Sequence, residues 1–325
     1  MTTSPKRAEW PDAPARDSKF QVTRSFTVLL AAFGLTMFLV ATAGFARPTH
    51  SPEIGAQRLV GKFAYATHKG DIWIVNADGS DNRQVTRSGA GFDFKPSWSA
   101  DGKQIAFQST RGVRPPSGET NILVINVDGS GERQLTTPSR FRYGGSSPDW
   151  SPDGKRIAFG SALGLALIRP SGGPVRLVGV PGDAPSWSPD SSKIAYVAPT
   201  GSGQPPNQDV YIVSPSGSRP RRLTKEPGLD FTGAWSPDGK RVAYFVQERG
   251  SGHTMIADSD GSHAAQITRA VGTQFPSDWI IDGRLVVGIS KPRERTPTWY
   301  LMRPDGSQLR LLPQLKAAIV VAWHR

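Results

Sequence analysis

Short apolar runs alternate with polar turns along most of the chain, and this pattern predicts β-strands rather than helices. The runs IAF, IAY and VAY are bounded by Asp-Gly or Ser-rich turns, as in WSPDGKRIAFG at residues 150–160. Short apolar runs between turn residues are typical of strands. Glycine supplies the positive φ that tight hairpins require. We therefore expect an all-β fold from Lys62 to Arg325.

The strand pattern repeats along the chain. Tryptophan marks the first strand of each repeat, and Trp235, Trp279 and Trp323 are spaced 44 residues apart. A second signature, such as ILVINVDGS at 122–130, follows and ends in another turn, and a third, such as RQLT at 133–136, closes the repeat. Each repeat thus predicts a four-stranded antiparallel meander. Four-stranded units repeated at this spacing are typical of β-propeller blades.

The first and last repeats are incomplete and complement each other. Residues 62–86 carry the later strands of a repeat without a tryptophan strand, whereas the strand Ile319–Arg325 carries Trp323 without later strands. The 264 residues from Lys62 to Arg325 correspond to six repeats of 44. We predict a six-bladed β-propeller that the C-terminal strand closes by pairing with the first strand of the domain.

The repeated tryptophans are expected to pack between blades, because a single blade cannot bury both of its faces. Stacking against a ligand is the alternative role. The residues concerned are Trp98, Trp150, Trp187, Trp235, Trp279 and Trp323.

The motif P-x-W-S-P-D-G-K followed by I-A-F, A-D-G-S and R-Q-L-T resembles the repeat of the TolB-like propellers of the Tol-Pal envelope system. The resemblance covers residues 54–325, although blade 3 is degenerate and blade 6 carries IIDGR at 280–284. It implies a propeller that binds other envelope proteins and is not an enzyme. It extends to the propeller portion only, since the α/β domain that precedes the TolB propeller has no counterpart in the residues before blade 1.

One apolar segment precedes the repeats. Residues 25–46 carry no charge. They contain about 21 consecutive residues that hydrocarbon would accept, and at ~1.5 Å per residue a helix of about 21 residues spans ~31 Å, about one bilayer core. Basic residues lie upstream, which predicts a cytoplasmic N-terminus. We expect a cytoplasmic tail (1–24), a single-pass anchor (25–46), a linker (47–61) and the propeller (62–325). A cleaved signal peptide is the alternative for 25–46. Both place the propeller outside the cytoplasm, either on its anchor in the cell envelope or as a secreted or periplasmic protein.

The composition of the chain excludes several kinds of chemical site. The chain has no cysteine, so disulfides, thiolate nucleophiles and cysteine-ligated metals are excluded. The five histidines show no metal-ligand spacing, and we expect no metal, no cofactor and no catalytic residue. The net charge of +12 favours acidic partners. Many arginines fall on the last strand of each repeat, where charge protects an exposed sheet edge.

Variable loops on one face of the propeller are the expected partner-binding surface, because binding usually lies in loops on a rigid scaffold. The opposite face carries the short Asp-Gly turns. We expect an envelope protein or peptide as partner and a monomeric protein, with an anionic wall polymer as an alternative partner; nucleic acid is not expected outside the cytoplasm. The candidate binding residues are Arg114, Phe141, Arg142, Tyr143, Arg293 and Arg295.

Acidic residues precede five of the tryptophan strands and are expected near the mouth of the propeller channel. They predict either a pocket for a cation or a basic peptide, or capping of backbone N–H groups. An enzyme or a carbohydrate-binding or wall-polymer-binding propeller that uses this acidic mouth is the alternative to a protein-binding module. The residues are Asp93, Asp149, Asp183, Asp230 and Asp278.

Overall fold

The computed structural model describes residues 59–112, 120–137, 144–201, 207–225, 228–248, 251–269, 272–291, 294 and 296–324. These residues all belong to one compact part of the chain, Thr36–Arg325. Within them, one short 3-10 helix, η1 (Pro313–Leu315), accompanies 24 β-strands. The all-β prediction is therefore confirmed for this part of the chain.

The strands form antiparallel meanders, which we call units and number along the chain. Unit 1 contains β24 (Ala318–His324), β1 (Lys62–Thr67), β2 (Ile72–Asn76) and β3 (Arg83–Gln84). Unit 2 contains β4 (Asp93–Trp98), β5 (Gln104–Ser109), β6 (Asn121–Asn126) and β7 (Arg133–Gln134). Unit 3 contains β8 (Ser146–Trp150), β9 (Ile157–Ser161), β10 (Gly164–Ile168) and β11 (Arg176–Leu177).

The remaining units continue the same order. Unit 4 contains β12 (Asp183–Trp187), β13 (Ile194–Thr200), β14 (Asn207–Val213) and β15 (Arg221–Arg222). Unit 5 contains β16 (Leu229–Trp235), β17 (Arg241–Glu248), β18 (Ser251–Asp258) and β19 (Ala265–Gln266). Unit 6 contains β20 (Thr273–Trp279), β21 (Leu285–Ser290), β22 (Thr298–Met302) and β23 (Arg310–Leu311).

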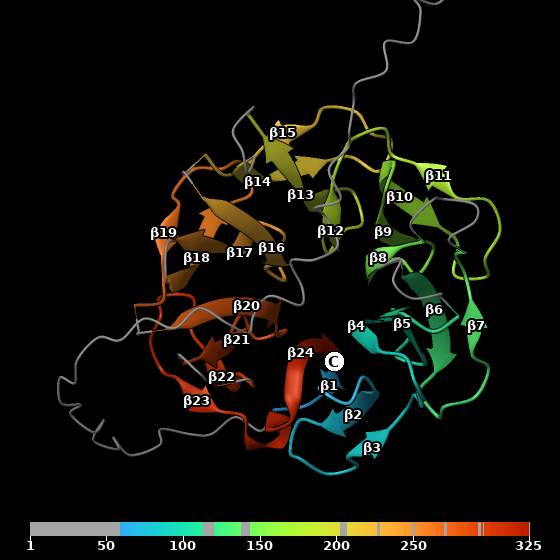
Figure 1. Cartoon of the computed structure of the whole chain (residues 1–325). Helices are drawn as coiled ribbons and strands as arrows, with labels where there is room; N and C mark the ends of the chain where they lie inside the picture. Colours follow the sequence, from blue (N-terminus) through green and yellow to red (C-terminus); the bar gives the residue numbers. More distant parts are fainter. Residues whose placement is uncertain are drawn as a thin grey trace, which may run out of the picture. The chain divides into compact units, whose positions relative to one another are not determined.

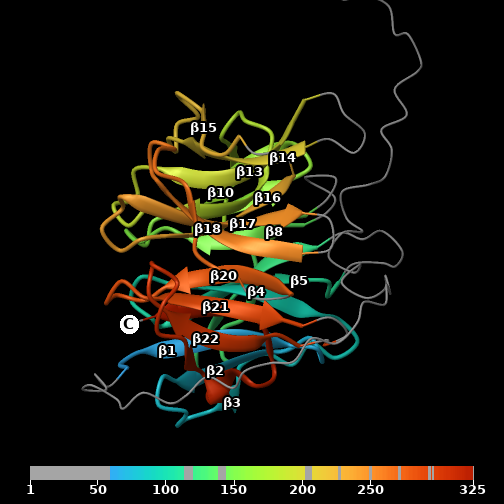
Figure 2. The same cartoon turned by 90° about the vertical axis from the view of Figure 1, so that its left-hand side faces the viewer.

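The units are arranged around a common centre (Figure 1). The tryptophan strands β24, β4, β8, β12, β16 and β20 lie innermost, and the two-residue strands lie at the rim. Viewed from the side, the strands run between two faces (Figure 2). The turns that join the first to the second strand and the third to the fourth strand of a unit form one face, here called the turn face. The other connections form the loop face.

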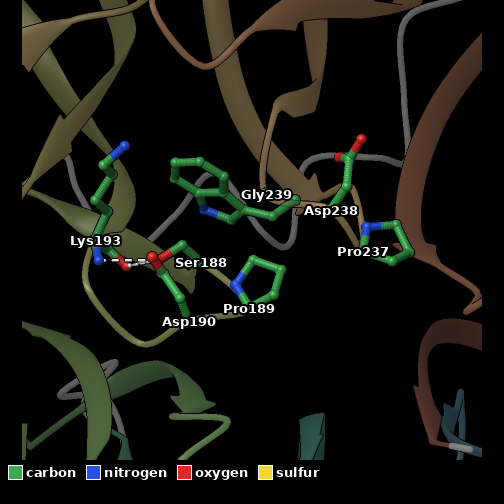
Figure 3. A pocket seen from close by; sticks show the side chains of 8 residues that line it. Ser188, Pro189, Asp190, Lys193, Pro237, Asp238 and Gly239 are labelled. Atoms are coloured by element: carbon green, nitrogen blue, oxygen red, sulfur yellow. Dashed lines mark hydrogen bonds between the residues drawn. The ribbon is translucent and has the colours of Figure 1, made fainter.

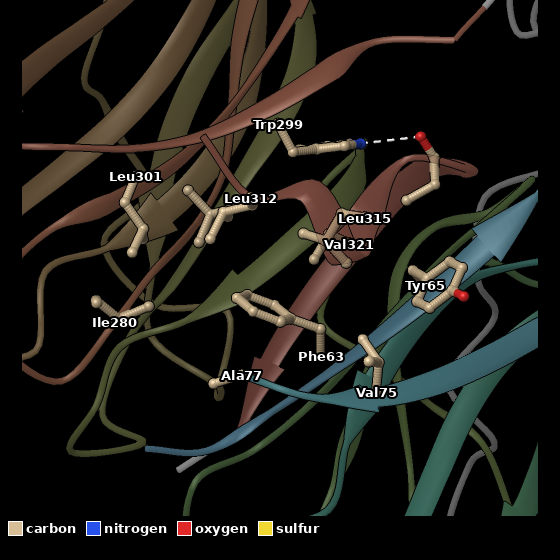
Figure 4. Packing of buried hydrophobic residues seen from close by; sticks show 12 residues of the cluster. Phe63, Tyr65, Val75, Ala77, Ile280, Trp299, Leu301, Leu312, Leu315 and Val321 are labelled. Carbon is tan, nitrogen blue, oxygen red and sulfur yellow. Dashed lines mark hydrogen bonds between the residues drawn. The ribbon is translucent and has the colours of Figure 1, made fainter. Parts of the chain in front are cut away.

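The C-terminal strand returns to the start of the domain, as expected from the incomplete repeats. Strand β24 pairs antiparallel with β1, with Trp323 opposite Phe63, and the centroids of their rings are 4.7 Å apart. Units 6 and 1 share a buried cluster that includes Phe63, Trp299 and Leu315 (Figure 4). The Trp299 indole N–H donates to the Ala318 carbonyl over 2.9 Å. Residues from both ends of the domain therefore form one core.

Five of the repeated tryptophans are buried in the core clusters, and Trp323 is partly buried against one of them. Four of the six also hydrogen-bond across unit boundaries. In four units the indole N–H donates to a backbone carbonyl of the preceding unit, at the residue just before that unit's own tryptophan. The pairs are Trp98 with Ala322 (3.3 Å), Trp187 with Asp149 (3.1 Å), Trp235 with Ser186 (3.0 Å) and Trp279 with Ala234 (3.0 Å). Each of these indoles thus both packs and bonds between two units.

Four arginines of the outer strands also connect neighbouring units, here called arginine clasps. Each guanidinium donates to a carbonyl in the next unit's outer turn: Arg83 to Val127, Arg133 to Pro170, Arg176 to Pro215, and Arg221 to Ser259 and Asp260. The sequence predicted that these arginines protect exposed sheet edges, but this is only part of their role, because their side chains also bond to the adjacent unit. In unit 5 the strand register places Ala265 at the position of these arginines. Between units 6 and 1 the Gln314 side-chain amide donates to the Ala77 carbonyl over 2.8 Å.

The repeated Ser-Pro-Asp-Gly sequence explains the turn face locally. In unit 3 the Ser151 hydroxyl donates to the Asp153 carboxylate over 2.6 Å, and the same carboxylate oxygen accepts from the Lys155 backbone N–H over 3.1 Å. Gly154 has a φ of 73°, which a residue with a side chain adopts only at a cost. The motif therefore satisfies its own polar groups and fixes the hairpin.

The apolar segment 25–46 lies outside the described residues. In the part of the chain that the structure describes, no helix has the length and apolar character needed to span a bilayer.

Candidate functional site

The predicted partner-binding residues all lie outside the described residues. The described strands that flank these gaps end at the loop face, because they are the second and third strands of one unit or the last and first strands of consecutive units. These residues stay predictions: Arg114, Phe141, Arg142, Tyr143, Arg293 and Arg295.

Asp149 and Asp278 form one type of acidic site, immediately before Trp150 and Trp279. Asp149 accepts the Trp187 backbone N–H over 2.7 Å and the Ser97 hydroxyl over 3.1 Å. Asp278 accepts the backbone N–H groups of Trp279 and Trp323, each over 2.8 Å. Both carboxylates therefore cap backbone donors, and each bridges its own unit to the next.

Burial raises the pKa of Asp149 to about 6 and that of Asp278 to about 7, although the N–H donors act in the opposite direction. The charge of Asp149 contributes to the raised pKa of Asp278. Their strands, β8 and β20, lie on opposite sides of the centre (Figure 1). The two carboxylates thus repel each other across the central region.

Asp93 and Asp230 differ from this pair because both are fully buried near the loop face. The Arg111 Nε lies 3.0 Å from an Asp93 carboxylate oxygen. Burial raises the pKa of Asp93, while Ser109 and Arg111 lower it. These contacts are typical of a structural ion pair at the base of a loop.

A further buried carboxylate, Asp209, escaped the sequence analysis. It lies 2.9 Å from the Arg222 Nη2. In the parallel pair between units 4 and 5, Gln208 is opposite Leu229, so Asp209 and Asp230 follow at adjacent positions across the boundary. A charged residue inside the apolar strand NQDVYIV was the available signal.

Asp183 is exposed at the start of β12 and accepts the Ser146 hydroxyl over 2.8 Å. Lys95, which the sequence analysis also missed, interacts with it electrostatically. Burial lowers the pKa of Lys95 and the charge of Asp183 raises it. Lys95 adopts a φ of 53°, so the inner strand departs from regular alternation there.

The five predicted acidic residues therefore occupy three environments and do not form one ring. Two cap backbone donors between units, two are buried near the loop face, and Asp183 is exposed. Within the described residues, no three His, Asp or Glu side chains are arranged to hold a metal ion.

A pocket of about 330 Å³ lies elsewhere, on the turn face between units 4 and 5 (Figure 3). The turn between the first and second strands of each of these units lines it, together with the indole of Trp235. Its lining residues are Ser188, Pro189, Asp190, Lys193, Trp235, Pro237, Asp238 and Gly239.

Comparison with known proteins connects this geometry to a family. The family model described as the TolB beta propeller domain matches residues 177–317. A protein named "Protein TolB homolog" from Chlorobium luteolum is 32% identical over 164 residues, which cover 48% of this chain and 34% of the relative. The chain thus spans about a third of that relative's length.

Two solved structures share the fold at low sequence identity. The putative TolB from Agrobacterium tumefaciens has a TM-score of 0.59 and 20% identity, covering 78% of this chain and 87% of that chain. TolB from Acinetobacter baumannii has a TM-score of 0.62 and 18% identity, covering 81% and 66%. The described domain is therefore similar to TolB β-propellers, in sequence over residues 177–317 and in fold over most of the chain.

Proposed function

We propose that this chain is a six-bladed propeller that binds other proteins in the cell envelope and catalyses no reaction. The observation that carries this proposal is the architecture itself: a ring tied across its unit boundaries by indole and arginine hydrogen bonds presents variable loops on one face. Variable loops on a rigid scaffold are where binding residues are usually found. The similarity to TolB proteins supports the same conclusion.

Capture of the partner tests the proposal. The full chain, carrying a photo-crosslinker at one loop-face position, is crosslinked in intact cells and its adducts are identified by mass spectrometry. We expect a defined envelope protein that is lost when Phe141 and Arg142 are both replaced by alanine. The matched control, Lys155→Ala on the turn face, should retain it. Equal capture by both variants would contradict binding through this loop.

The proposed location is outside the cytoplasm, with residues 25–46 as a membrane anchor and the N-terminus in the cytoplasm. Their length, apolar character and basic flank support this placement. Protease treatment of intact or outer-membrane-permeabilised cells should remove the propeller but leave a tag at the N-terminus protected. Release of a soluble propeller that begins after residue 46 would instead support signal cleavage.

The acidic residues give weaker support to the alternative, an enzyme or polymer-binding propeller. Asp149 and Asp278 use their oxygens to accept backbone donors, and Asp93 is paired with Arg111. These contacts explain the carboxylates as structural groups. We therefore prefer the protein-binding function.

A further inference from the structure

The pocket lies between units 4 and 5. At the unit boundaries on either side of it, a guanidinium lies over the tryptophan of the inner strand. At the boundary of units 3 and 4, the Arg156 Cζ lies 5.3 Å from the Trp187 ring centroid. At the boundary of units 5 and 6, the Arg241 Cζ lies 5.4 Å from the Trp279 centroid. Both distances fall within the range of a cation–π contact. The fold therefore repeats a guanidinium-over-indole contact at these two boundaries.

Unit 4 carries Lys193 at the equivalent position. Arg156, Lys193 and Arg241 each stand six residues after their own unit's tryptophan. The Lys193 side chain is exposed and lies across the pocket from Pro237 and Asp238 (Figure 3). Lysine carries a compact ammonium on a flexible stem, whereas arginine presents a planar group that stacks on aromatic rings. The substitution leaves a pocket lined by Lys193 and Trp235 in place of the third contact.

The remaining walls suit the same cation. Pro189 and Pro237 supply apolar surface, and Asp190 and Asp238 supply carboxylates. Hydrogen bonds from Ser188 and Ser192 lower the pKa of Asp190 to about 2, so this group is charged at neutral pH. Two carboxylates beside one ammonium leave the pocket with a net negative charge. An anionic ligand is therefore disfavoured.

We propose that this pocket binds the guanidinium group of an arginine side chain from another polypeptide. The guanidinium takes the position that Arg156 and Arg241 occupy at the adjacent boundaries, against the small exposed part of Trp235 and in the pocket that Asp190 and Asp238 also line. Trp235 is only 5% exposed, so Lys193 moves aside when the ligand enters. The site lies on the turn face and does not depend on the loop-face binding proposed above.

Indole NMR tests this inference directly. The full chain is labelled with ¹⁵N-tryptophan in a mild non-ionic detergent, and Trp235→Phe identifies the Trp235 signal. N-acetyl-arginine methylamide is the probe and N-acetyl-lysine methylamide is its comparison. We expect a saturable shift of the Trp235 signal with the arginine probe in the millimolar range, at least fivefold weaker with the lysine probe.

Two lysine variants separate a specific site from general charge attraction. In Lys193→Arg the protein's own guanidinium fills the pocket, and the response to the arginine probe should fall at least tenfold. Lys155→Arg makes the same change on another exposed turn and should respond like the wild type. The other indole signals report that each variant is folded. An undiminished response in Lys193→Arg, equal responses to the two probes, or no saturable shift would each overturn the proposal.

Discussion

Asp278 shows how one side chain can make the stability of the ring depend on pH. Its pKa is about 7 in the folded protein and near 3.9 in an unfolded chain. The folded state therefore binds more protons between these values, so the free energy of unfolding falls as pH rises from about 4 to about 7. Part of the side chain remains accessible to solvent, which reduces the effect.

Replacing Asp278 with asparagine should remove this dependence. The amide oxygen still accepts a backbone N–H, but no charge forms at high pH. We expect Asp278→Asn to gain about 2 kcal/mol relative to the wild type between pH 4.5 and pH 8, measured by urea denaturation. Asp190→Asn is the control, because the pKa of Asp190 is lowered to about 2 and Asp190 stays ionised across this range. Identical pH profiles for Asp278→Asn and the wild type would contradict the assignment.

At this scale the sequence located five acidic residues of the inner strands but did not predict their environments. The reason is a β-bulge in the inner strands: the register shifts between Phe94 and Ser97 in β4 and between Ser146 and Asp149 in β8. A bulge changes which face of the strand a side chain occupies. Asp149 stands one residue before its tryptophan and Asp93 stands five residues before its own. Strict alternation could not predict that the first caps backbone donors while the second is buried in an ion pair, because the bulge lies between these two positions.

At the scale of the element, the arginine clasps link the outer strands from unit to unit. Arg133 donates both Nε (3.2 Å) and Nη2 (2.8 Å) to the Pro170 carbonyl. Because the donor is charged, we expect Arg133→Ala to lower the free energy of unfolding by about 1 to 2 kcal/mol. Arg310→Ala is the matched control, since Gln314 bonds to unit 1 instead, and it should change stability by less than about 0.5 kcal/mol. Chemical denaturation measures both.

Unit 5 offers the converse experiment, because Ala265 occupies the position of the clasp arginines. Ala265→Arg places a guanidinium beside the outer turn of unit 6, where Pro304 corresponds to Pro170. We expect a gain of about 0.5 to 1 kcal/mol, measured as a shift of the urea midpoint. Ala265→Lys has the charge without the planar donor group and should gain less. Equal effects of the two variants would show that charge alone is responsible.

The sequence predicted the strands well, because each Asp-Gly turn and each apolar run reports its own local structure. The clasps could not be predicted in this way. The same arginine on an outer strand can face solvent or bond to the next unit, and the choice depends on how closely two units approach. Arg133 and Arg310 occupy equivalent register positions, and only the first reaches a neighbouring carbonyl.

At the scale of the whole molecule, β24 completes the first unit. Removing Ala318–Arg325 deletes the inner strand of unit 1 and opens the cluster around Phe63, Trp299 and Leu315. We expect the truncated chain to lose its cooperative thermal transition, as followed by near-UV circular dichroism. A synthetic peptide of residues 316–325, added in excess, should restore it in part. A truncated chain with an unchanged melting temperature would contradict closure by this strand.

The sequence predicted this closure because the two incomplete repeats, at residues 62–86 and 319–325, have complementary strands. It did not reveal the pocket on the turn face, which lies at the boundary where Lys193 stands at the position of Arg156 and Arg241 in the two adjacent units. Periodicity reports what the repeats share, whereas a binding site arises where one repeat differs.

The pairing of Phe63 with Trp323 joins residues 260 positions apart, and this separation determines the order in which the chain can fold. Contacts this distant in sequence form slowly. Until β24 has been synthesised, β1 presents an open sheet edge beside an uncovered apolar cluster, and such edges promote aggregation. We therefore expect the chain to be most prone to aggregation before its final strand is available.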